Sequence, residues 1–177
     1  MRNAHRLWLL GLIALVLGSP ARAATSLEGG GIWSLERSDG GIRALAGLRF
    51  EGLDPKSASS HFGVSLFGGS GTGTHLGNAG LILDLGAGYA APLGENGRLV
   101  PSLAFTALGT VGEGGGGVDF GLMAGLGAVA VPEHGVGARA DVTLRWLSRG
   151  LGGGGASSSP SEFVLALTVG LAWPGQR

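Results

Sequence analysis

The sequence predicts an all-β protein, an eight-stranded antiparallel up-and-down β-barrel preceded by a cleaved signal peptide. Three observations predict it. In eight stretches of about ten residues, large apolar side chains alternate with small or charged ones; turn residues separate these stretches; and the N-terminus carries a short apolar run. Because a period of two places successive side chains on opposite faces of a strand, each stretch is a strand between two different environments.

The N-terminal residues are typical of a secretory signal peptide. Arg2 and Arg6 precede an apolar run from Leu7 to Leu17, and Ala21-Arg22-Ala23 offers a cleavage site with small residues. The apolar run is too short for a membrane-spanning helix, which needs about 20 residues. We assign residues 1–23 to the signal peptide and 24–177 to one barrel domain; an uncleaved anchor is the alternative.

Composition excludes several classes of function. Charged residues make up 14% of the chain, with 12 Lys and Arg against 12 Asp and Glu, and the signal peptide removes three of the arginines. The acidic balance that remains argues against a nucleic-acid partner, which requires a basic face. With no cysteine, the exported chain has neither disulfides nor a thiol for a lipid anchor.

The strands follow one another at regular intervals. We expect them over 25–36, 42–51, 61–69, 80–91, 99–111, 118–131, 136–146 and 162–173. Glycine-rich loops at 70–78, 112–117 and 148–161 fall at one end of these strands, and turns marked by proline fall at the other. Pro101 lies within the fifth strand, where its missing N–H conflicts with pairing on both sides.

The apolar face is expected to point outward, into lipid, so the barrel is transmembrane. An eight-stranded barrel is just wide enough to be filled by side chains, so six large residues per strand cannot all point inward. The aromatic residues form two belts, as at the two interfaces of a membrane barrel, while aromatics in a sandwich core are the alternative. One belt contains Trp33, Phe120, Trp146 and Phe163; the other contains Phe50, Phe62, Tyr89 and Trp173.

These features resemble the small outer-membrane β-barrels of the OmpA/OmpX type from Gram-negative bacteria. The signal peptide, the even number of strands and a last strand ending in Leu171-Ala172-Trp173 carry the resemblance over the whole mature chain. The four residues after Trp173 depart from the family, in which the aromatic is usually last. The resemblance implies a monomer in the bacterial outer membrane, in contact with outer-membrane lipid and inserted by the barrel-assembly machinery.

Charged residues on the small-residue face are the main candidates for a site. Near the glycine-rich loops we expect an ion network of Glu36, Arg43, Arg145 and Glu162; Asp84, Asp119, Arg139 and Asp141 extend it, with Glu28, Arg49 and Glu51 near the other rim. Buried charges need such partners. A plugged lumen is the favoured interpretation, and a path for solutes is the alternative.

Catalysis is the second functional class. His61 and Ser65 share one face but lie about 13 Å apart, too far for a base and its nucleophile, while His75 and His134 fall in connections. We therefore predict no enzyme, no cofactor and no metal site, but a structural or surface-interaction protein whose specific task stays open. The alternatives are a soluble secreted or periplasmic barrel that binds an apolar ligand and, less favoured, an outer-membrane enzyme that modifies lipids.

Overall fold

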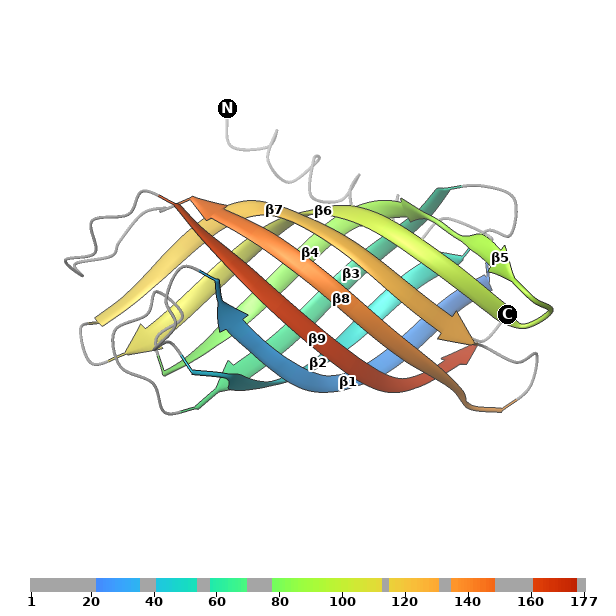
Figure 1. Cartoon of the computed structure of the whole chain (residues 1–177), viewed down its shortest axis with the longest axis horizontal. Helices are drawn as coiled ribbons and strands as arrows, with labels where there is room; N and C mark the ends of the chain where they lie inside the picture. The colour runs from blue at the N-terminus through green and yellow to red at the C-terminus, as the bar shows by residue number, and fades with distance from the viewer. Residues whose placement is uncertain are drawn as a thin grey trace, which may run out of the picture.

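The computed structural model describes residues 22–35, 41–53, 58–69, 78–112, 115–130, 135–148 and 161–174 (Figure 1). These residues form strands that pair in antiparallel fashion. The strands are β1 (Arg22–Ser34), β2 (Arg43–Leu53), β3 (Ala58–Gly68), β4 (Ala79–Tyr89), β5 (Ala91–Leu93), β6 (Gly97–Gly112), β7 (Gly115–Ala130), β8 (Gly137–Ser148) and β9 (Ser161–Pro174). No helix in the described part of the chain is long and apolar enough to cross a membrane.

The sheet closes on itself. Its order is β4-β3-β2-β1-β9-β8-β7-β6-β5, and β4 also pairs with β6, which joins the two ends. β5 has three residues and pairs with β6 beyond the end of β4, so the barrel wall has eight strands over the described residues. The eight-stranded antiparallel barrel predicted from the sequence is confirmed.

The register fixes the shape of the barrel. A row of paired residues that leaves Ala23 on β1 returns to β1 at Trp33, ten residues further along. The row passes through Gly52, Ser60, Ala87, Leu103, Ala124, Leu144 and Leu165. With eight strands, this shift tilts them by about 40° and leaves a radius of about 8 Å. Side chains can fill such an interior.

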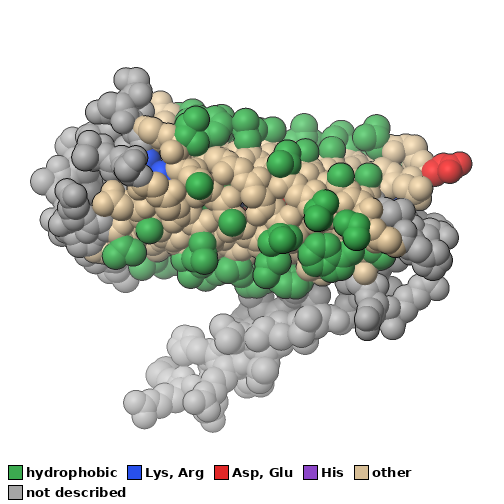
Figure 2. Space-filling model, turned by 90° about the horizontal axis from the view of Figure 1, so that it is seen from below, with side chains coloured by type: hydrophobic (Ala, Val, Ile, Leu, Met, Phe, Trp, Pro, Cys, Tyr) green, Lys and Arg blue, Asp and Glu red, His purple; other side chains and the backbone are tan. Residues whose placement is uncertain are grey.

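The two faces of the wall differ as the alternation predicts. Leu83, Val142 and Leu167 are 39%, 47% and 45% exposed, whereas Arg43 and Arg145 are 0% and 3% exposed. Hydrophobic side chains are spread over the outer surface in Figure 2. The apolar flank of the strands therefore faces outward, and the charged flank faces the lumen.

Strand boundaries differ from the expectation at a few places. β1 begins at Arg22, two residues before the expected start of the barrel domain at Ala24. The stretch expected as one strand over 80–91 divides at Ala90 into β4 and β5. This division accommodates Pro101, because β6 pairs with β4 as far as Ser102 and with β5 only from Leu99. Pro101 thus lies where β6 exchanges one neighbour for the other, and its missing N–H leaves no ladder bond unmade on that side.

Candidate functional site

The lumen is divided into layers. We call the end where β1 begins and β9 ends the terminal end, and the opposite end the loop end. A loop-end apolar layer consists of Ile32, Leu45, Phe67, Ile82, Leu108, Leu147, Val164 and Ala166. A terminal-end apolar layer consists of Ala24, Ala90, Val100, Val129 and Ala172. Along β1, Glu28 lies four residues from Ala24 and four from Ile32, so it and the charged side chains that contact it are enclosed between two apolar layers.

Five charged residues form an inner charge cluster between these layers. They are Glu28, Arg49, Glu51, Arg139 and Asp141, and each is at most 7% exposed. Arg139 donates to both oxygens of Asp141, Nε to Oδ2 at 2.5 Å and Nη2 to Oδ1 at 2.8 Å, and its Nη1 donates to Glu51 Oε2. Arg49 Nε lies 3.1 Å from Glu28 Oε1, and its Nη1 lies 3.7 Å from Asp141 Oδ1. The two guanidinium groups thus hold three carboxylates together.

Small neighbours make room for this cluster. Glu28 on β1 faces Gly47 on one side and Gly170 on the other, so its carboxylate can reach across the lumen. Its two oxygens accept hydrogen bonds from the hydroxyls of Ser26, at 2.8 Å, and Thr168, at 3.1 Å. A side chain at Gly127 would overlap Asp141 and Arg139. The small residues of the inner face therefore leave space for a few long charged side chains.

A separate ion pair crosses the barrel. Arg145 on β8 places Nη2 2.6 Å from Asp84 Oδ2 on β4, and its Nη1 donates to Thr143 Oγ1 at 2.7 Å. β6 and β7 separate these two strands in the wall. The pair therefore spans the lumen and obstructs it, with Asp84 4% and Arg145 3% exposed.

The remaining charges expected near the loops are distributed as follows. Arg43 is fully buried and interacts electrostatically with Glu162, which is 4% exposed. Asp119 is half-buried near the loop end of β7, and Glu36 lies outside the described residues. The sequence placed Arg145 in one network with Glu162 and extended that network to Asp84, and in the structure Arg145 contacts Asp84. A pairing across the lumen cannot be read from the heights of residues on neighbouring strands.

His61 was considered in the sequence only as a possible base. It is 1% exposed, faces the lumen and lies opposite Glu51 in the ladder. Neither of its ring nitrogens has a hydrogen-bond partner, and the same holds for Glu51 Oε1. His75 and His134 lie outside the described residues, which contain no group of three residues able to hold a metal ion. A buried histidine opposite a carboxylate was missed because its strand partner depends on the register.

The aromatic residues of the two expected belts point outward. Trp146 pairs with Phe163 near the loop end, and Phe105 stacks on Phe120 at 6.1 Å. Phe50 stacks on Phe62 with ring centroids 6.4 Å apart. Trp33 lies next to the loop end of β1, while Tyr89 and Trp173 lie at the terminal ends of β4 and β9. Rings at both ends of the wall therefore border the apolar surface.

The comparisons with known proteins concern the fold. No protein-family model matches the sequence, and no curated protein matches it significantly. The crystal structure of Neisserial surface protein A (NspA) is similar over 85% of this chain and 94% of that one, with a TM-score of 0.56 and 9% identity. The N-terminal β-barrel domain of Pseudomonas aeruginosa OprF aligns over 86% and 98% of the two chains, with a TM-score of 0.49 and 16% identity. The chain thus has the fold of the small eight-stranded outer-membrane β-barrels.

Proposed function

We propose that this chain is a bacterial outer-membrane β-barrel with a sealed polar lumen that serves as a structural or surface-interaction protein. One observation carries the proposal: large apolar side chains are exposed around the outside of the wall, while Arg43, Arg145 and the inner charge cluster are buried within it. This arrangement inverts that of a water-soluble protein. Membrane barrels alternate apolar residues toward lipid with polar residues toward the lumen.

The layered lumen favours a structural role over transport. The loop-end and terminal-end apolar layers close the lumen on both sides of the inner charge cluster, and the Asp84–Arg145 pair crosses it. An eight-stranded barrel has room for side chains but not for an aqueous channel. We propose a lumen that stabilises the barrel and passes no solute, and a chain without a catalytic step.

The second candidate is a soluble barrel that carries an apolar ligand. Such a protein needs an apolar cavity inside, but here the middle of the lumen holds guanidinium and carboxylate groups in contact with one another. The described residues therefore favour the membrane protein. In this proposal the terminal end faces the periplasm, the glycine-rich segments face outward, and the barrel-assembly machinery inserts the chain as a monomer.

Fractionation tests the proposal directly. The chain is expressed with its N-terminal segment in a Gram-negative host, and the membrane and periplasmic fractions are compared. We expect extraction only with detergent and a mobility in gel electrophoresis that changes on heating, because a closed barrel resists unfolding by detergent. Recovery of the whole protein from the soluble periplasmic fraction would favour the ligand carrier instead.

Orientation has its own test. An epitope placed in segment 148–161 should be accessible to antibody on intact cells, whereas an epitope after Arg177 should require permeabilised cells. The reverse accessibility would refute the proposed orientation but not the membrane location.

A further inference from the structure

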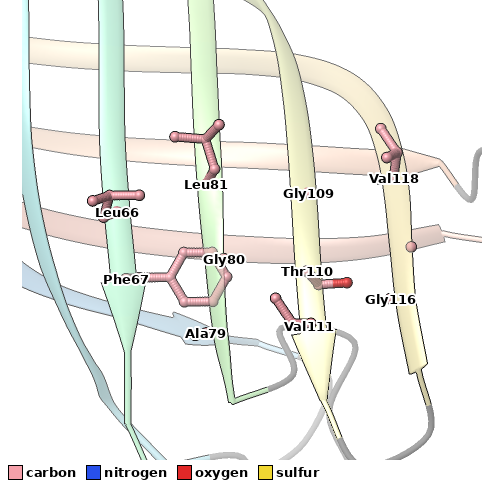
Figure 3. A pocket seen from close by; sticks show the side chains of 11 residues that line it. Leu66, Phe67, Ala79, Gly80, Leu81, Gly109, Thr110, Val111, Gly116 and Val118 are labelled. Atoms are coloured by element: carbon pink, nitrogen blue, oxygen red, sulfur yellow. The ribbon is translucent and has the colours of Figure 1, made fainter.

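A shallow apolar groove lies on the outer face of the wall near the loop end. It has a volume of about 750 Å³ and runs across β3, β4, β6 and β7. Figure 3 shows its centre, where Leu81 of β4 and Val118 of β7 lie on either side of Gly109 of β6. Leu66 and Val111 line it further out, and both are exposed.

The groove exists because small residues interrupt an otherwise bulky surface. Gly109 pairs with Leu81 on one side and with Val118 on the other, so two large side chains flank a position that has none. Two residues further along β6 toward the loop end, Val111 lies between Ala79 and Gly116. The surface is therefore hollowed at Gly109 and beside Val111.

We propose that this groove seats an acyl chain of a membrane lipid. The inference rests on the proposed function, because it requires the outer face to be in lipid. The groove is continuous with the lipid-facing surface, since Gly109 and Val118 form the next outward-facing pair after Ala107–Phe120, two ladder positions along, and Phe120 belongs to the loop-end aromatic belt. A chain from the surrounding membrane can enter it without crossing a polar surface.

The chemistry of the groove fits a hydrocarbon better than a peptide. The side chains that face outward from its lining are aliphatic, Phe67 and Thr110 belong to the lumen side of the wall, and no lining residue is charged. Along the groove β4 and β6 are paired on both sides, so their backbones offer no free edge to an added strand. Peptides that dock on sheets gain affinity from such edges, whereas a methylene chain needs only close apolar contact.

The test fills the groove at its floor. A Cβ atom at Gly109 would meet only the carbonyl oxygen of Leu81, at 3.9 Å, and the φ angle of Gly109 is not positive. Gly109→Leu should therefore fold and occupy the seat. Ala124→Leu is the matched control, because Ala124 is an exposed small residue on the outer face of β7, outside the groove.

The probe is a phosphatidylcholine vesicle containing phosphatidylcholine with a diazirine on one acyl chain. After illumination, mass spectrometry compares labelling at Leu81, Val111 and Val118 with labelling at Leu35 and Phe163, two outward residues at the same end of the barrel. In the wild-type protein we expect about threefold more label in the groove, because a seated chain gains contacts on several sides. Gly109→Leu should abolish this excess, and Ala124→Leu should retain it.

The other outcomes would overturn either the acyl-chain inference or the proposed function. Equal labelling at both places, or an excess that survives Gly109→Leu, would overturn the inference alone. If Gly109→Leu loses its heat-modifiable mobility, Gly109→Ala takes its place and should lower the excess in part; an unchanged excess would again overturn the inference. Failure of the wild-type protein to float with the vesicles would overturn the proposed function as well.

Discussion

The ion pair between Asp84 and Arg145 gives the sharpest test of a sealed lumen. Arg145→Met removes the guanidinium group that donates to both oxygens of Asp84, at 2.6 and 3.4 Å, and leaves the carboxylate without this partner. Breaking a buried pair in this way costs about 3–5 kcal/mol, because the remaining charge stays out of water. The ratio of folded to unfolded protein should fall by a factor of about 10²–10⁴.

The double substitution separates the cost of an unpaired buried charge from the net contribution of the ion pair to stability. Asp84→Leu combined with Arg145→Met leaves no charge at the crossing, and replacement of a buried pair by apolar residues is often neutral. We expect each single substitution to cost more than the double, with a coupling energy of about 4 kcal/mol or more. Arg98→Met, at the start of β6 beside the β5–β6 turn, is the control and should change stability by less than about 1 kcal/mol.

Urea unfolding of the refolded barrel in phosphatidylcholine vesicles provides the measurement. Fluorescence of the outward tryptophans, among them Trp146 and Trp173, reports the loss of the lipid-facing wall, and linear extrapolation gives the free energy of unfolding. If Arg145→Met costs less than about 1 kcal/mol, water reaches Asp84, and the reasoning from a sealed lumen is refuted.

The remaining predictions concern the wall and its packing. Val142→Arg, on the outer face of β8, should cost about 2–4 kcal/mol in vesicle unfolding, whereas Ala138→Arg near the terminal end should cost about 0–1 kcal/mol; equal costs would contradict a membrane-spanning wall. Gly121→Ala should destabilise the barrel by about 1–3 kcal/mol or prevent folding, because its Cβ would overlap a carbonyl oxygen of the neighbouring strand. Gly63→Ala, whose Cβ meets nothing closer than 3.6 Å, should fold normally in the same refolding assay. Phe67→Ala should lower the free energy of unfolding by about 3–5 kcal/mol, because it opens a cavity in the loop-end apolar layer; an unchanged midpoint would show that the layer is loosely packed.

The strands and their two faces could be predicted from the sequence because both depend on local alternation. Ile42, Leu48 and Phe50 against Arg43 and Arg49 already separate an outer from an inner face, and the structure exposes the first three and buries the two arginines. The outward orientation of the apolar face could be inferred from the volume of the interior, because an eight-stranded barrel cannot enclose every large side chain. These inferences required no knowledge of which strands lie across the lumen from one another.

The layers of the lumen could not be predicted in the same way. Leu45 and Ile82 stand on the charged face of their strands and looked like exceptions to the alternation, but in the barrel they meet Phe67 in the loop-end apolar layer. That meeting depends on the ten-residue shift around the barrel, which sets the heights of all strands together. The split of the stretch over 80–91 at Ala90 has the same origin, since it follows from how far β4 can pair with β6. Single strands carry no information about this shift.

The loop-end layer and the Asp84–Arg145 pair should stabilise each other, and this can be measured. Ile82 of the layer lies two residues from Asp84 on the inner face of β4, and the ring of Phe67 covers the neighbouring strand at Gly80. If the layer keeps water from Asp84, its removal admits water and lowers the cost of an unpaired carboxylate, because screening weakens the charge. Arg145→Met should therefore cost less by about 1–2 kcal/mol in the Phe67→Ala background than in the wild type. Strictly additive costs would show that the apolar layer and the ion pair stabilise the barrel independently, with the pair already in contact with water.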